Sequence, residues 1–246
     1  MRSLLLAVLA AYIVAAIHAI LAFVNKRKTL QVVALWSLAA GFVLHTAALL
    51  ADWIIDGHYP LFYLRETLSF FGWALAATYA LILYRYRTQA LGAFILPLVT
   101  GLVFVATLIR PDSNTAISTS GVSTTWLFPV HTTLLIFAYA AFFVVFIASS
   151  MYLFQERALK HKTFGAGFHR LPSLTTVNEI ATSAALIGVT FLTLGIATGM
   201  IWSSARDGRL WHNDPKEIFA ALTWLLYAGL ILYRSTAKWR GRRGPG

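Results

Sequence analysis

Long apolar segments alternate with short polar or basic loops along the whole chain. Each apolar segment is roughly 20 residues long, which is the length of an α-helix that crosses a bilayer. The pattern predicts seven such helices, over residues 3–24, 30–51, 66–84, 90–109, 129–153, 177–203 and 215–234. We therefore expect an all-α fold: a polytopic transmembrane helical bundle that forms a single integral membrane domain over residues 1–246.

The polar segments between these helices differ in character. Residues 25–28, 84–87 and 155–174 are basic, residues 110–128 are rich in Ser and Thr, and the tail after residue 234 is strongly basic. The first apolar segment is too long and too evenly apolar for a cleaved signal peptide, so we expect it to remain as the first span.

The positive charges have a consistent placement that predicts the orientation. The loops after the first, third, fifth and seventh spans, together with Arg234 at the end of the last span, hold fourteen of the 20 Lys and Arg residues. Cytoplasmic loops carry the excess of Lys and Arg, so the N-terminus is expected outside and the C-terminus in the cytoplasm. The net charge of +11 is thus a topology signal, and we expect no nucleic-acid partner.

Composition narrows the chemistry. The chain is 59% hydrophobic and 12% charged, and it contains no cysteine, which excludes a thiol relay, a disulfide framework and Cys-ligated zinc. The HExxH, P-loop and GxGxxG patterns are absent as well. We expect a binding protein and no enzyme.

A Trp-rich stretch between the last two spans, residues 202–224, concentrates aromatic rings and charges on the predicted outer side. Interfacial Trp belts are common in membrane proteins, which is the simpler interpretation of these rings. Asp214 precedes Pro215, so it is expected to cap the last helix, with Glu217 in the first turn. This leaves Arg206, Arg209 and Lys216 as cations without a structural explanation.

Four histidines are candidate ligands, because a neutral imidazole binds haem iron or zinc through a ring nitrogen. His131 opens the fifth span, and His45 lies inside the second, where an ionisable group is costly. His58 and His212 lie in predicted outer loops. Each also has an ordinary structural interpretation, as an interfacial, helix-bonded or loop histidine, and the residues alone leave both open.

Three segments carry a resemblance to a known family. They are GHYPLFYLRETL at residues 57–68 with Trp73, VHTTLLIFAYAA at 130–141, and GMIW, WHNDPKE and LTW between residues 199 and 224. In this order they resemble the cytochrome c assembly proteins of the CcsA, CcmC and HemX type, over about residues 30–235. The short chain and the altered Trp-rich motif are most similar to the HemX-like branch.

The resemblance implies that haem b is bound non-covalently at the outer membrane face. His131 would be an axial ligand of the haem iron, and Trp202, Trp211 and Trp224 would lie against the macrocycle. Arg206, Arg209 or Lys216 would meet the propionates, and His45, His58 or His212 would be candidates for the sixth iron position. The chain would then handle or deliver haem during c-type cytochrome biogenesis, in the bacterial inner (plasma) membrane as a multi-pass protein.

The chain also departs from the family pattern. GRLWHND at 208–214 replaces the family's WGSYWSWD, and Leu232 stands where many members carry a histidine. A later histidine segment has no counterpart before Gly246, so we expect either a truncated chain or a shorter branch.

The partners implied by the resemblance are haem, other biogenesis membrane proteins and apocytochrome c, which would supply the thiols. One alternative is a membrane scaffold that regulates haem-biosynthetic enzymes through the basic loop at residues 155–174 and the basic tail, and binds no haem. Another is a small-molecule transporter, for which Pro97 and Gly101 are a weak indication.

Overall fold

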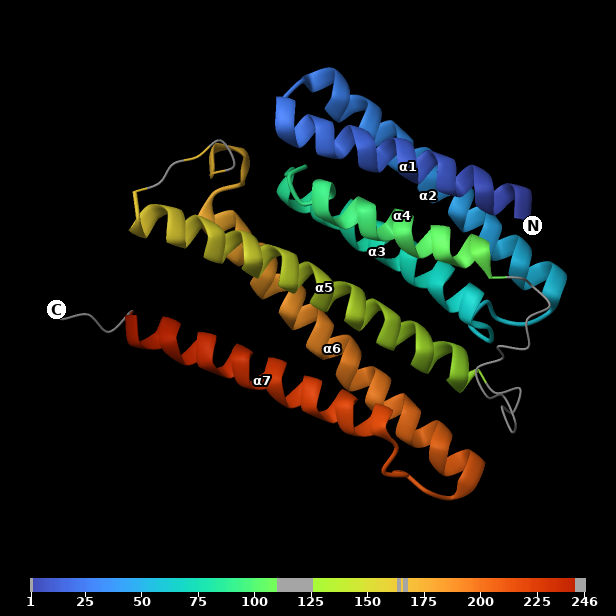
Figure 1. The fold of residues 1–246 in the computed structure, drawn as a ribbon. Coiled ribbons are helices and arrows are strands. Elements are labelled where there is room, and N and C mark those ends of the chain that lie inside the picture. Colours follow the sequence, from blue (N-terminus) through green and yellow to red (C-terminus); the bar gives the residue numbers. More distant parts are fainter. Residues whose placement is uncertain (1, 110–125, 163–164, 166–167, 242–246) are drawn as a thin grey trace. The chain divides into compact units, whose positions relative to one another are not determined.

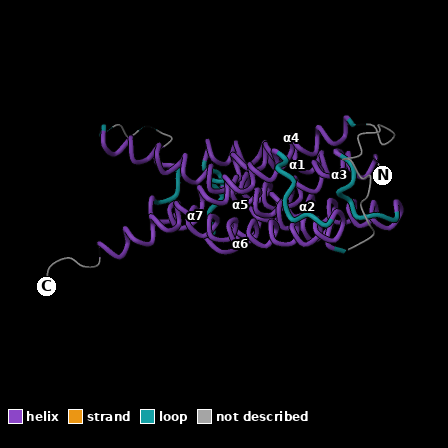
Figure 2. Tube along the Cα trace, turned by 90° about the horizontal axis from the view of Figure 1, so that it is seen from below, coloured by secondary structure: helices purple, strands orange, loops and turns teal. Residues whose placement is uncertain are grey.

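The computed structural model describes residues 2–109, 126–162, 165 and 168–241. These residues form helices and connecting loops, with no strand among them (Figure 2). The helices, shown in Figure 1, are α1 (Arg2–Asn25), α2 (Lys28–Asp56), α3 (Leu64–Tyr86), α4 (Gly92–Leu108), α5 (Leu127–Lys160), the short 3-10 helix η1 (Phe168–Arg170), α6 (Leu174–Asp207) and α7 (Pro215–Gly241). Residues 110–125, which hold most of the predicted Ser/Thr-rich loop, lie outside the described part.

The predicted helical membrane bundle is confirmed. Six described helices are long and apolar enough to cross a membrane by length and composition, and α4 is a shorter apolar helix. With 17 residues, α4 extends about 25 Å at the usual helical rise of about 1.5 Å per residue. The predicted orientation, with the N-terminus outside, remains a prediction.

Several predicted helix ends were wrong, because loss of hydropathy marks where a membrane ends and not where a helix ends, and α5 and α2 are two examples. Helix α5 continues seven residues past Leu153 through a strongly helix-forming sequence, and Glu156 pairs with Lys160 one turn later at 2.8 Å. Residues 155–160 therefore belong to a helix and not to the predicted basic loop. Helix α2 likewise runs to Asp56 and ends at Gly57, whose left-handed backbone (φ 68°) closes the last turn.

The chain divides into two compact units, one of residues Met1–Ser120 with Phe146–Ala181, the other of Gly121–Val145 with Thr182–Gly246. In the first unit, α1 packs against α2 and α4, and α3 packs against α4. Small residues permit this close packing. A Cβ on Gly41 of α2 would lie only 2.9 Å from the Tyr12 ring of α1. The prediction of one domain over the whole chain remains a prediction.

In the second unit, glycines on one face of α6 receive side chains of α5. Gly188, Gly195 and Gly199 are spaced by seven and four residues, so they share a helical face. A Cβ at these positions would lie 2.5 Å from the Phe142 ring, 2.6 Å from Leu135 and 2.5 Å from the His131 ring, respectively. This contact fixes how α5 lies against α6, and it places His131 at the end of the series.

Helix α7 completes the core of the second unit. Tyr227 stacks on Phe142 with ring centroids 3.9 Å apart, beside Ala138 and Leu192, which are fully buried. Other residues of α7, such as Phe219 and Leu226, are exposed, as expected of a helix that faces lipid. The core therefore holds α5, α6 and α7 together.

Candidate functional site

A cavity of about 430 Å³ lies in the second unit, which is within the usual range for small-molecule sites of about 300–1,000 Å³. Helices α5, α6 and α7 and the 208–214 loop all contribute to it. The residues that line it are His131, Leu135, Tyr139, Ile196, Gly199, Met200, Trp202, Ser203, Arg206, Leu210, Trp211, His212, Asp214, Lys216, Glu217 and Ala220. The cavity thus combines an apolar wall with a cluster of titratable groups.

His131 enters this cavity from the first turns of α5. Its Nδ1 lies 2.7 Å from the carbonyl oxygen of Gly195. A carbonyl oxygen can only accept, so Nδ1 carries a proton, and in the neutral imidazole Nε2 keeps its lone pair. This is the tautomer in which a histidine coordinates a metal through Nε2, with the other nitrogen held by a second group. No described residue hydrogen-bonds to Nε2.

Gly199 gives the imidazole its space. A Cβ at this position would lie 2.5 Å from His131 Cε1 and 2.7 Å from Nδ1, which is too close for any real side chain. The ring cannot move away without breaking its bond to Gly195. A glycine at residue 199 is therefore a condition of the observed His131 orientation.

Trp202 forms a flat wall beside the histidine. The two rings are inclined by only 29°, with centroids 6.3 Å apart. The indole Nε1 of Trp202 is buried and has no hydrogen-bond partner in the described residues. The guanidinium of Arg206 lies 4.9 Å from the centre of the Trp202 ring and also pairs with Asp207. The wall thus offers an aromatic face, an unused donor and a cation.

These residues lie within a segment that matches a known family. The profile described as "Cytochrome C assembly protein" matches residues 61–244, which is most of the chain. This chain belongs to the cytochrome c assembly protein family. The family resemblance predicted from the sequence is therefore confirmed, and membership supports a role in the assembly of c-type cytochromes.

Curated relatives agree with this assignment. Proteins named "Cytochrome c biogenesis protein CcsA" from Synechococcus sp. (strain JA-2-3B'a(2-13)) and Synechococcus sp. (strain CC9311) are 31% and 29% identical. The first comparison covers 80% of this chain and 72% of the relative, and the second 89% and 81%. A protein of the same name from Prochlorococcus marinus subsp. pastoris is 28% identical over 79% of this chain and 68% of the relative. The HemX-like branch remains a prediction.

His212 lines the same cavity of this assembly-family protein, and side chains of α6 and α7 lie close to both of its ring nitrogens, although its buried Nε2 forms no hydrogen bond with the described residues. Its Nδ1 lies 3.1 Å from Ser203 Oγ and 3.5 Å from Glu217 Oε1, and its Nε2 lies 3.2 Å from Asp207 Oδ2. This arrangement ties the loop to both flanking helices, which agrees with the structural interpretation of His212.

The predicted cap of the last helix is confirmed. Asp214 accepts the backbone N–H of Lys216 at 3.0 Å, and Glu217 accepts the N–H groups of Asp214 and His212 at 3.3 and 2.8 Å. The bond from the Lys216 N–H, followed by its ammonium, lowers the pKa of Asp214. The cap holds Lys216 at the cavity, where its Nζ lies 3.3 Å from Asp214 Oδ2.

Two predicted site residues lie away from the cavity. Arg209 is exposed in the loop and does not line it. Trp224 lies one turn beyond Ala220 on the same face of α7 and outside the cavity, where it packs against the core of the second unit and donates its Nε1–H to Thr193 Oγ1 at 2.8 Å. Trp211 does line the cavity, with its Nε1–H donated to Asn213 Oδ1 at 2.8 Å.

His58 belongs to the first unit and has a local explanation. Its Nδ1 lies 3.2 Å from the Tyr59 carbonyl and 3.9 Å from Glu66, and its ligand atoms, with those of Asp56 and Glu66, lie within 4.8 Å of one another. Glu66 is buried and accepts backbone N–H groups of Phe62 and Tyr63 at 3.0 and 3.3 Å. The GHYPLFYLRETL motif is thus used to close the turn between α2 and α3.

His45 also lies in the first unit, fully buried between helices. Its Nδ1 is 3.3 Å from the Tyr12 hydroxyl and its Nε2 is 2.9 Å from Ser69 Oγ. Both nitrogens are therefore engaged by neighbouring helices, as the structural interpretation of this residue expects. The predictions that His45, His58, Arg209 and Trp224 contact haem gain no support from their surroundings.

Sequence reasoning gave no role to Gly195 or Ser203, which hold His131 and His212. Gly195 acts through its carbonyl oxygen, which any residue possesses. The usable signal was the spacing of the glycines on α6, which marks the face where another helix approaches closely.

Proposed function

We propose that this cytochrome c assembly protein binds haem b non-covalently in the cavity of the second unit, with His131 as an axial ligand. The observation that carries the proposal is the state of the imidazole. Nδ1 is held by the Gly195 carbonyl, and Nε2 keeps a lone pair at a cavity wall. Haem, when bound, supplies an iron that accepts an imidazole nitrogen and two carboxylates that need cations.

The other lining residues fit such a ligand. Trp202 offers a flat aromatic face and a buried, unused N–H donor. Arg206 and Lys216 line the same cavity and are suited to the two carboxylates. Apolar side chains such as Leu135 and Ile196 complete a wall that suits a macrocycle. The cavity therefore contains groups suited to the iron, the macrocycle and the carboxylates of haem.

The proposed role is to hold and present haem and to catalyse no reaction, at the outer face of a bacterial plasma membrane. The chain has no cysteine, so attachment of haem to a c-type cytochrome needs thiols from apocytochrome c. The proposed partners are therefore apocytochrome c and other membrane proteins of c-type cytochrome biogenesis.

The test is the absorption spectrum of the full chain, purified in detergent and supplied with haem. We expect a Soret band in the wild-type protein and the loss of most of it in His131→Ala. His161→Ala is the matched control, because His161 is exposed at the end of α5 in the first unit. Colourless wild-type protein, or equal bands in all three proteins, would refute the proposal and favour the scaffold without haem.

A further inference from the structure

A second cavity, of about 510 Å³, lies in the first unit, and the haem proposal does not use it. It is formed where α1 and α3 end and where α2 and α4 begin, together with the segment after η1. The loops at this end follow the first, third and fifth predicted spans. The positive-inside rule places all three on the cytoplasmic side.

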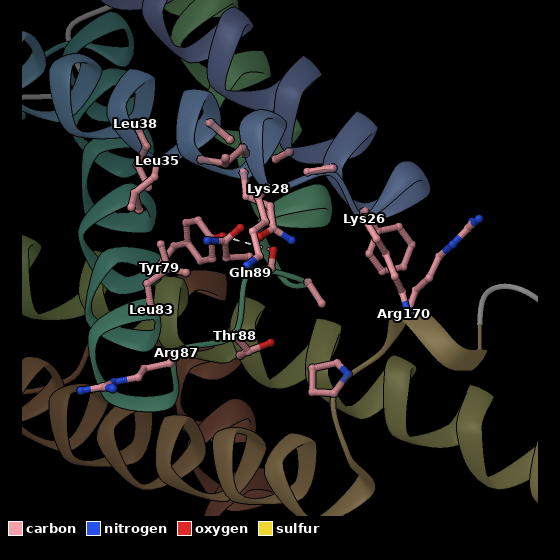
Figure 3. Close-up of a pocket in the computed structure, with 18 of the residues that line it drawn as sticks. Lys26, Lys28, Leu35, Leu38, Tyr79, Leu83, Arg87, Thr88, Gln89 and Arg170 are labelled. Atoms are coloured by element: carbon pink, nitrogen blue, oxygen red, sulfur yellow. Dashed lines mark hydrogen bonds between the residues drawn. The ribbon is translucent and has the colours of Figure 1, made fainter.

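The rim of this cavity is cationic. Lys26, Lys28, Arg87 and Arg170 line it, and no Asp or Glu does. None of the four forms an ion pair with a carboxylate in the described part of the chain, although Lys26 donates to the carbonyl of His169 at 2.7 Å. In Figure 3, Arg87 and Arg170 extend on opposite sides, with Lys28 between them. The rim thus presents uncompensated positive charge.

Neutral polar groups accompany the cations. The side chains of Gln31, Thr88 and Gln89 line the cavity, and the Gln89 carbonyl accepts the Tyr79 hydroxyl at 3.3 Å. Amide and hydroxyl donors beside lysine and arginine are the groups that bind phosphate oxygens. An anionic phosphate is therefore the chemistry that this rim matches.

The interior of the cavity is apolar. Small residues of α1 and α2, Ala19, Ala22 and Ala34, leave room between the helices, and Leu38 and Leu96 close the inner end. From Lys28 to Leu38 along α2 the distance is about 15 Å at a rise of about 1.5 Å per residue. A ligand that fills this space has a charged head group and an apolar body about 15 Å long.

The backbone adds a separate observation. Lys26 and Arg87 end α1 and α3 in the left-handed conformation, with φ of 52° and 51°, where glycine is the usual residue. Lys162, beyond α5, has the same conformation (φ 55°) but does not line the cavity. A substitution at Lys162 therefore shows what a change at a left-handed residue does when that residue is not part of the cavity.

We propose that this cavity is a binding site for an anionic phospholipid of the cytoplasmic leaflet, with the phosphate at Lys28 and its neighbours and acyl carbons against the alanines. Basic pockets between membrane helices on the cytoplasmic side are suited to such headgroups. The site lies in the other unit from the haem cavity and does not depend on haem binding.

The test uses delipidated full-length protein supplied with equal amounts of phosphatidylglycerol and phosphatidylcholine, with bound lipid counted by native mass spectrometry. The cavity variant is Lys26→Gln/Lys28→Gln/Arg87→Gln. The control variant, Arg85→Gln/Arg157→Gln/Lys162→Gln, removes the same charge from the same predicted side outside the cavity. We expect the wild type and the control to prefer phosphatidylglycerol, and the cavity variant to bind it at least about tenfold more weakly.

Three results would overturn the proposal. Equal loss in the cavity and control variants would mean general surface charge, and no loss in either would mean that the cavity is not the site. Displacement of the lipid by millimolar inorganic phosphate would mean a site for free phosphate, because phosphate has no acyl chain. A cavity variant that keeps phosphatidylglycerol but loses added haem would assign the cavity to haem instead.

Discussion

Two histidines, His45 buried in the first unit and His131 half-buried in the second, show how differently the same side chain is used. His45 has a hydrogen-bond partner for each ring nitrogen, Tyr12 on one side and Ser69 on the other. His131 has one partner, a backbone carbonyl, and its second nitrogen is left at a cavity wall. The first arrangement satisfies the imidazole and fixes helices, whereas the second prepares the imidazole to bind something else.

The difference extends to the surroundings. His45 is fully buried, with the Tyr12 ring edge-on at 5.7 Å, and it lines neither cavity. His131 shares its cavity with Trp202, Arg206 and Lys216. Satisfied polar groups in an apolar interior are a structural device, and a half-satisfied group beside a cavity indicates a ligand. Variants that affect one histidine and leave the other unchanged can test whether the two have different roles.

A large loss of haem binding, without removal of the ligand itself, is expected from Gly199→Ala. The new Cβ would lie 2.5 Å from the His131 ring, so it must displace the imidazole from its bond with Gly195. We expect haem affinity to fall by about tenfold or more, which corresponds to about 1.4 kcal/mol, in a haem titration followed at the Soret band. Gly229→Ala is the matched control, because a Cβ on this α7 glycine meets nothing within 4 Å. Equal haem affinities in the two variants would show that Gly199 has no influence on haem binding.

His45→Ala is expected to lower the stability of the protein and to leave haem binding unchanged. Removal of this imidazole leaves the Tyr12 and Ser69 hydroxyls without a buried partner and opens a cavity. The free energy of unfolding should therefore fall by about 1–3 kcal/mol. Thermal unfolding in detergent, followed by helical circular dichroism, measures the loss. Haem bound per folded molecule should remain at the wild-type level, and a lost Soret band in stably folded His45→Ala would show that the two histidines share a function.

The smallest effect is expected at the helix cap beside the cavity of the second unit. Asp214→Asn keeps an oxygen that accepts the Lys216 N–H but removes the charge. The pKa of Asp214 is lower in the folded protein, so its charge contributes stability above its unfolded pKa of about 3.9, and this contribution is lost as the pH falls through the folded value.

The wild type should therefore melt slightly above Asp214→Asn at pH 6, and the difference should shrink below about pH 4. Melting temperatures of both proteins, measured side by side across this range, give the result. A difference that grows as the pH falls would contradict the assigned direction of the pKa shift.

Features that depend only on the order of residues along the chain could be predicted from the sequence. Apolar length identified the spans, and the Asp214-Pro215 pair located the start of α7 with its cap. The position of His131 at the start of one span and of Trp202 at the end of another placed them on the same predicted side. These inferences need only the alternation of helices across a membrane.

What depends on how the helices pack could not be predicted. Trp224 was expected at the macrocycle, but it lies one turn beyond the cavity-lining Ala220 on the same face of α7, where it meets Thr193 and the core. The partners of His45 come from α1 and α3, which no local pattern reveals. The bond that orients His131 ends on a backbone oxygen, so no residue type marks it.

The most direct test of the account is chemical rescue at residue 131. The full chain with His131→Gly, purified in detergent and supplied with haem, is measured with and without added imidazole. We predict little Soret absorbance without imidazole and recovery of most of the wild-type band with it, because free imidazole can occupy the space of the lost ring. A His131→Gly protein with the complete wild-type spectrum in the absence of imidazole would contradict the account.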